Sequence, residues 1–238
     1  MRPHVSKQIL VVQNAPSSPI GLVGEVFEQD GVSFDLLHPY ERDAIPSSSN
    51  GYDGLVILGG PQNALADDTH PYLPALAEVT RTCGTEGKAS AGMGGGEQRS
   101  GRDEGAEKMR EKEREFGEEK GRPREEAKDE PVVQVLNKPT PIFQWHSDTF
   151  SLPGGATLLA SSDMTPHQTI RLDRAVYAFQ FHFELIPQTL DMWQGLAAER
   201  FGESRPGWQK QFTSLRARYA ENAEGFGRSL TRAWLNQV

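Results

Sequence analysis

The chain has 238 residues, a formal net charge of −8 and a sequence pI near 5.3. This length is sufficient for one large α/β domain, and we expect a single domain over residues 1–238. The acidic balance argues against a surface that neutralises phosphates, so we expect a small-molecule or protein partner, no nucleic acid and no membrane. Without an apolar run near the roughly 20 residues that span a bilayer, and without a signal-peptide pattern, the expected location is cytoplasmic.

Metal and disulfide chemistry are not expected. Cys83 is the single cysteine, which excludes an internal disulfide and a cysteine-cluster metal site. The six histidines are scattered and show no HExxH-like ligand spacing. We therefore expect no metal and no cofactor.

The N-terminal part of the chain alternates strand-like and helix-like segments. A short apolar run predicts a strand that is buried on both faces at Ile9–Gln13, and further strands are predicted at Val32–Leu37 and Gly54–Gly60. A helix is expected between the first two, with Ser17 or Ser18 as its cap and Pro19 in its first turn. Gly31 ends it, residues 70–81 begin another helix, and a further buried strand is due after Gly87. This order predicts right-handed crossovers and a doubly wound, mostly parallel α/β sheet with helices on both faces.

The C-terminal part returns to ordinary patterns. Short strands are predicted at residues 132–136, 141–148, 156–162 and 168–172, and a buried strand at Ala175–Glu184. The last part of the chain is predicted to be helical. One apolar face is expected to pack on the sheet, formed by Phe212, Leu215, Tyr219, Phe226, Leu230 and Trp234.

Three small groups of residues could carry chemistry. Leu58–Gln62 reads LGGPQ, a turn at the end of a buried strand where backbone N–H groups can approach a ligand; a plain turn is the alternative. The sequence QFHFE places His182 and Glu184 where the carboxylate can orient the imidazole of a general base; a structural histidine is the alternative. The third group is His146 and Asp148, and such a pair is more often a surface hydrogen-bonding pair than a catalytic one.

Together and in this order, these groups resemble the class I glutamine amidotransferases, especially stand-alone proteins similar to the amidotransferase domain of GMP synthase. The segments ILVVQN, GYDGLVILGGP, FQWHSDTFSLPGGATLLASS, HQTIRL and YAFQFHFE each resemble a family block, and they cover nearly the whole chain. Phe183 departs from the proline of the usual QFHPE. The resemblance implies a three-layer, flavodoxin-like α/β fold, glutamine or a γ-glutamyl compound as substrate, and ammonia release to a synthetase or acceptor partner.

The resemblance also implies roles for individual positions. In this family a cysteine on a tight strand-to-helix turn attacks the glutamine side-chain amide, with His182 as the base and Glu184 as its orienting acid. Backbone N–H groups of Gly60 and Gly95 would stabilise the oxyanion. The implied substrate-binding positions are Gly59, Gly60, Gly95, Gln98 and His146.

The implied nucleophile position holds a glycine. The family's elbow reads Gly-x-Cys-x-Gly-x-Gln, and the matching residues here are Gly92, Gly94, Gly96 and Gln98. Gly94 has no side chain with which to attack, so the triad as written cannot perform covalent catalysis. Cys83 precedes Gly94 by eleven positions near the end of a predicted helix, where we expect an ordinary buried or loop thiol.

The surrounding segment, residues 84–130, has an anomalous composition. Of its 47 residues, 25 are charged, 10 are glycine and none is Val, Ile or Leu. Composition alone indicates a disordered linker that lacks the apolar strand and helix of an elbow. However, the spacing of the landmark residues is kept without gaps, at Gly87, Lys88, Gly92, Gly96 and Gln98.

Three interpretations of this segment stay open. The chain is a degenerate amidotransferase-like protein with a binding or scaffolding role, or the segment is a charged insert that engages a partner. The third interpretation is that residues 84–130 as written differ from the natural ones, because Glu, Lys, Gly and Arg, which purine-only codons encode, dominate the segment. In that case residue 94 is expected to be cysteine. A γ-glutamyl hydrolase of the same fold would use the same triad and is a further alternative.

Overall fold

The computed structural model describes residues 6–62, 66–94, 108–202, 206–218 and 223–238. Within these residues the strands are β1 (Gln8–Val12), β2 (Ser33–Leu37), β3 (Gly54–Ile57), β4 (Ala89–Met93), β5 (Lys108–Pro123), β6 (Thr140–Phe150), β7 (Thr157–Ser161), β8 (Thr169–Leu172) and β9 (Val176–Phe179). The helices are α1 (Gly21–Asp30), α2 (Leu73–Thr85), α4 (Pro187–Phe201), α5 (Trp208–Arg218) and α6 (Glu224–Leu235). Three short 3-10 helices complete the described elements: η1 (Pro39–Glu41), η2 (Glu125–Ala127) and η3 (Val133–Val135).

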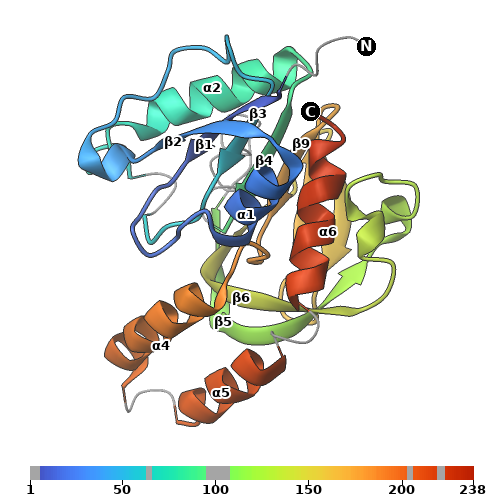
Figure 1. Cartoon of the computed structure of the whole chain (residues 1–238). Coiled ribbons are helices and arrows are strands. Elements are labelled where there is room, and N and C mark those ends of the chain that lie inside the picture. Colours follow the sequence, from blue (N-terminus) through green and yellow to red (C-terminus); the bar gives the residue numbers. More distant parts are fainter. Residues whose placement is uncertain (1–5, 63–65, 95–107, 203–205, 219–222) are drawn as a thin grey trace.

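The described strands form one sheet in the order β2-β1-β3-β4-β9-β8-β7-β5-β6. The pairings from β2 to β9 are parallel, and those from β9 to β6 are antiparallel. Helices α1 and α6 cover one face and α2 covers the other (Figure 1). The predicted α/β fold with helices on both faces is therefore confirmed, and an antiparallel extension follows the doubly wound half.

Alternating side chains explain the two covered faces. In β1, Ile9 and Val11 pack in the core cluster beneath α1 and α6, whereas Leu10 and Val12 pack in the cluster beneath α2. Successive residues of a strand point to opposite faces, so a continuous apolar run is what a strand covered on both faces requires. The apolar runs in the sequence identified these central strands for this reason.

Strand β4 lies in the middle of the sheet although its sequence, ASAGM, contains no β-branched residue. All five of its residues are buried. Ala91 and Met93 share a cluster with Tyr177 and Phe179 of the neighbouring strand β9, so large aromatic rings fill the space beside small residues. The sheet hydrogen bonds come from the backbone, which is why a strand forms here despite the composition.

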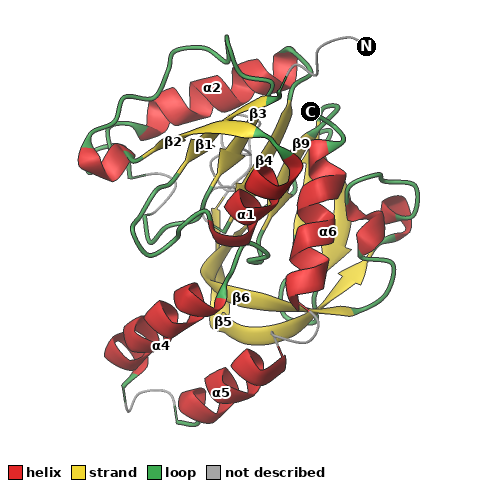
Figure 2. Ribbon diagram, in the orientation of Figure 1, coloured by secondary structure: helices red, strands yellow, loops and turns green. Residues whose placement is uncertain are grey.

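The long antiparallel pair β5 and β6 extends away from the parallel sheet, and α4 and α5 lie beside it (Figure 2). Phe116 of β5 and Phe143 of β6 contact each other edge to face at a ring-centroid distance of 6.2 Å. Trp193 of α4 and Phe212 of α5 belong to the same buried cluster. This second core fixes the strand β6 that borders the candidate site.

Several local predictions were wrong. Residues 132–136 form the 3-10 helix η3 and its flanks instead of a strand, because Val132 and Val133 are buried in a turn that packs on the main core. The expected single C-terminal stripe is divided between two helices. Phe212 of α5 packs in the second core, whereas Leu230 and Trp234 of α6 pack on the main core.

The start of α1 also differs from the prediction. The helix begins at Gly21, and neither Ser17 nor Ser18 caps it, since Ile20 occupies the cap position without a side-chain hydrogen bond. Instead, the Leu22 N–H donates to the carbonyl of Glu184. Among the described helices, none is both long and apolar enough to span a membrane.

Candidate functional site

Three segments meet where β3, β4 and β9 end. Gly59 follows β3, Gly94 follows β4, and His182 follows β9. A Cβ added to Gly59 would lie 3.2 Å from His182 Cε1 and 3.8 Å from Gly94 Cα. The carboxyl ends of parallel strands share one edge of the sheet, and ligands of open α/β sheets bind at that edge.

His182 and Glu184 form a buried hydrogen-bonded pair. Their Nδ1 and Oε1 atoms are 2.7 Å apart. An ionised carboxylate only accepts hydrogen bonds, so Nδ1 carries the proton and Nε2 is the basic nitrogen. The backbone N–H of His182 donates to the carbonyl of Phe143 at 2.9 Å, which ties the pair to β6. An imidazole oriented in this way can act as a general base.

Gly94 lies directly against this base. Its φ of +54° is in the left-handed region, where glycine carries no steric penalty. Its N–H donates to the carbonyl of Phe179 at 3.0 Å. A Cβ at position 94 would lie 3.1 Å from Nε2 and 2.8 Å from Cε1 of His182, so a side chain here would face the base and require a small shift of the ring.

The Gly-Gly-Pro turn is tied to the end of β1. Asn14, which is completely buried, donates from Nδ2 to the carbonyl of Leu58 at 2.6 Å. Gln62 Nε2 donates to the carbonyl of Asn14. A Cβ at Gly60 would lie 3.1 Å from Asn14 Cβ, so the turn lies close to this strand end. The sequence analysis did not identify Asn14, although it closes the ILVVQN segment.

Trp193 of α4 is a second residue that the sequence analysis missed. Its ring contacts that of His182 edge to face, with centroids 4.8 Å apart and planes at 89°. Its Nε1–H donates to the carbonyl of Ser17 at 2.6 Å. Trp193 therefore covers the His182 ring and is itself held in place by this hydrogen bond. Nothing in the sequence around Trp193 distinguished it from an ordinary core residue.

The remaining predicted site residues are placed as follows. His146 is buried on β6, three residues after Phe143. Asp148 lies opposite Arg110 in the register of β5 and β6. The predictions for Gly95 and Gln98, and the helix expected after the elbow, lie outside the described residues.

Cys83 lies at the opposite end of β4 from Gly94. The Lys88 N–H, just before β4, donates to the carbonyl of Cys83 at 2.9 Å. Cys83 belongs to α2, and its side chain is buried between this helix and the sheet. Burial raises the pKa of its thiol to about 11. A thiol protonated at neutral pH is a poor nucleophile. Within the ranges that the structure describes, no group of three or more His, Cys, Asp or Glu side chains could hold a metal ion.

Comparison with known proteins gives one consistent result. A protein-family model described as glutamine amidotransferase class-I matches residues 23–193. The glutamine amidotransferase-like protein YfeJ of Salmonella typhimurium is 28% identical over 167 residues, which cover 69% of this chain and 70% of that protein.

Solved structures agree at the level of the fold. A glutamine amidotransferase of Thermotoga maritima superposes with a TM-score of 0.86 and 22% identity, covering 97% of this chain and 99% of that one. A protein of Thermoplasma acidophilum that is named as a GMP synthase subunit gives a TM-score of 0.61 and 24% identity, covering 92% and 98%. These similarities establish the three-layer, flavodoxin-like arrangement.

Proposed function

Because the chain belongs to the class I glutamine amidotransferase family, we propose that its site binds glutamine and is built to hydrolyse the side-chain amide. The observation that carries the proposal is the geometry around position 94. A side chain there would start 3.1 Å from the basic Nε2 of His182, whose Nδ1 is bonded to Glu184. Gly94 supplies no nucleophile, so the chain as written binds glutamine without turnover, and a cysteine at this position makes the site catalytic.

The proposed reaction uses a thiol at position 94. His182 Nε2 takes the thiol proton as sulfur attacks the amide carbon, and the carbonyl oxygen becomes an oxyanion. His182 then returns the proton to the leaving nitrogen, which departs as ammonia and leaves a thioester. Water, deprotonated by His182, attacks the thioester carbon; the C–S bond breaks, glutamate is released, and His182 returns the proton to the sulfur to restore the thiol. Glu184 orients the imidazole and stabilises its charged form.

Backbone donors complete the proposed site. Gly59 brings the Gly-Gly-Pro turn against His182, and we assign the N–H of the next residue, Gly60, to the oxyanion together with that of Gly95. Loss of one such donor costs about 3–4 kcal/mol of transition-state stabilisation in enzymes that use them. Gln98 and His146 are proposed to contact the substrate.

The proposal includes a partner that consumes ammonia. The similar Thermoplasma acidophilum protein is named as a GMP synthase subunit. We therefore propose a separate synthetase or acceptor protein for this chain, with glutamine as the shared nitrogen source, and a cytoplasmic location.

The first experiment compares the chain as written with Gly94→Cys and Gly94→Ala. Ammonia release from glutamine is expected only from Gly94→Cys, because only this variant combines a thiol with the His182 base. The matched variant Gly94→Ala introduces the same Cβ without sulfur and so isolates the steric effect. Adding His182→Ala to the Gly94→Cys chain is expected to lower turnover about 10³-fold or more.

Each outcome decides between named alternatives. A folded Gly94→Cys chain that releases no ammonia would refute amide hydrolysis, whereas turnover by the Gly94 chain itself would refute the binding-only assignment. Calorimetric titration of the Gly94 chain with glutamine, glutamate and a γ-glutamyl peptide separates a glutamine site from a γ-glutamyl hydrolase. An intact mass of the protein from its natural source that agrees with the sequence as written would rule out the interpretation that residues 84–130 differ from the natural ones.

A further inference from the structure

The carboxylate of Glu184 depends on its backbone for its position. Oε1 accepts the hydrogen bond from His182. Oε2 is buried and, among the residues that the structure describes, has no hydrogen-bond partner. One hydrogen bond to a rotatable ring does not fix a carboxylate in space, so whatever holds the main chain at residues 183–184 also sets the geometry of the pair.

Two glycines from different helices touch this main chain. A Cβ at Gly21, the first residue of α1, would lie 2.2 Å from the carbonyl oxygen of Glu184. A Cβ at Gly227 of α6 would lie 2.3 Å from the carbonyl oxygen of Phe183 and 2.5 Å from Leu22 Cδ2. Real Cβ atoms do not approach backbone oxygens this closely, so both contacts require glycine.

Phe183, which stands where the family motif has proline, adds to this packing. Its ring lies 5.1 Å from that of Phe179 and 6.2 Å from that of Phe181, measured between centroids. The Leu22 N–H donates to the Glu184 carbonyl at 2.8 Å. Ring packing and a backbone hydrogen bond thus hold a segment that lacks the stiffness of proline.

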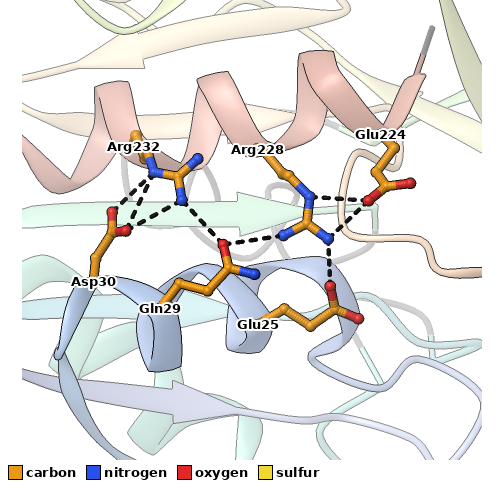
Figure 3. A network of polar contacts seen from close by, with 6 residues as sticks. All are labelled: Glu25, Gln29, Asp30, Glu224, Arg228 and Arg232. Atoms are coloured by element: carbon orange, nitrogen blue, oxygen red, sulfur yellow. Dashed lines mark hydrogen bonds and ion pairs between the residues drawn. The ribbon is translucent and has the colours of Figure 1, made fainter.

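A polar network fastens α6 to α1 across the outer surface (Figure 3). Arg228 of α6 donates to Glu25 of α1 at 2.6 Å and to Gln29 at 3.4 Å. Arg232, one turn later, donates to Asp30 at 3.0 Å and to Gln29 at 3.1 Å. Because both arginines bind side chains of α1, the two helices are held together where they contact residues 183–184.

We propose that Gly21 and Gly227 are positioning residues that let α1 and α6 clamp the backbone of Phe183 and Glu184 and so set the His182–Glu184 hydrogen bond. The catalytic meaning of this clamp rests on the proposed function. The hydrogen bond itself can be measured in the Gly94 chain without turnover.

The test compares Gly227→Ala with Gly225→Ala in the chain that is otherwise as written. Both residues lie in α6, and both changes replace glycine by a better helix former. A Cβ at Gly225 would meet no described atom within 4 Å, which makes this variant the matched control. The readout is the downfield proton resonance of His182 Nδ1–H, assigned by its loss in Glu184→Gln.

We expect this resonance to be lost or displaced in Gly227→Ala and unchanged in Gly225→Ala. Equal spectra for the two variants would overturn the clamp. If Gly227→Ala does not fold, the double variant Arg228→Gln, Arg232→Gln takes its place. It weakens the grip of α6 on α1 at the surface, and broadening of the resonance supports the clamp whereas an unchanged resonance refutes it.

A kinetic arm uses the Gly94→Cys background. There Gly227→Ala is expected to lower kcat about 10-fold or more with KM within about twofold, because base orientation and not substrate binding is disturbed. A kcat equal to that of the parent Gly94→Cys chain would count against the clamp. Absence of turnover in the parent Gly94→Cys chain would refute the proposed function alone, since the resonance still reports on the clamp.

Discussion

Replacing Gly21 with alanine is expected to lower the free energy of unfolding by about 2–3 kcal/mol or more. Gly21 has a φ of +48°, and a residue with a side chain in this region costs about 1–2 kcal/mol. The added Cβ would also lie 2.2 Å from the Glu184 carbonyl oxygen. No side-chain rotation relieves a contact between Cβ and a backbone oxygen, so the 2.8 Å bond from Leu22 N–H to this oxygen is lost at about 0.5–1.5 kcal/mol.

Gly31→Ala is the matched control for this prediction. Gly31 ends α1 with a φ of +69°, but a Cβ there would meet no described atom within 4 Å. Gly31→Ala is expected to lower the free energy of unfolding only by the cost of placing alanine in the left-handed region, about 1–2 kcal/mol. Urea unfolding followed by far-UV circular dichroism measures both variants. Equal losses of stability, with equal m values, would refute the claim that α1 presses on the Glu184 backbone.

Three further outcomes are expected. Burial, and after it the hydrogen bond to Glu130, raises the pKa of Tyr177 above its ordinary value. The Tyr177 hydroxyl therefore adds to the free energy of unfolding in full below pH 10. This contribution declines above pH 10, where the tyrosine of the unfolded chain ionises. Tyr177→Phe should therefore lower the free energy of unfolding by about 1.5–3 kcal/mol at pH 8, and by progressively less toward pH 11, as measured by urea titration. A loss of stability that grows with pH would contradict this prediction. Cys83, with a thiol pKa of about 11, should react with a disulfide reagent at pH 8 at least about 100-fold more slowly in the folded than in the urea-unfolded chain, and comparable rates would contradict its burial. Trp193→Phe keeps an aromatic ring beside the base but removes the donor to the Ser17 carbonyl, with an expected cost of about 0.5–1.5 kcal/mol by urea unfolding, and no loss would show that the bond contributes nothing.

The meeting of the site segments could be predicted from sequence. Apolar runs before Gly59 and His182 identified buried strands, and buried parallel strands end at one edge of a sheet. His182 and Glu184 also show a local pattern, a spacing of two at a strand end. These features depend on residues that are neighbours in the chain, so the sequence contains them directly.

The supporting contacts could not be predicted in the same way. Gly227 is separated from Phe183 by more than 40 positions, and Gly21 from Glu184 by more than 160. A glycine that admits a distant carbonyl looks the same in sequence as one that ends a helix or faces solvent. Trp193 was likewise indistinguishable from an ordinary core residue. Such contacts are set by helix packing, which no local pattern encodes.

Residues 84–130 separate what a backbone can provide from what a side chain must provide. The strand β4, the positive φ of Gly94 and its hydrogen bond to Phe179 need only main-chain atoms, and all three occur in a segment without Val, Ile or Leu. The nucleophile needs a side chain, and at position 94 the chain as written has none. His182 and Glu184 are already paired beside that position, so under the proposed function a single residue separates a glutamine-binding protein from an amide hydrolase. A substitution at position 94 therefore tests the function more sharply than removal of either member of the pair.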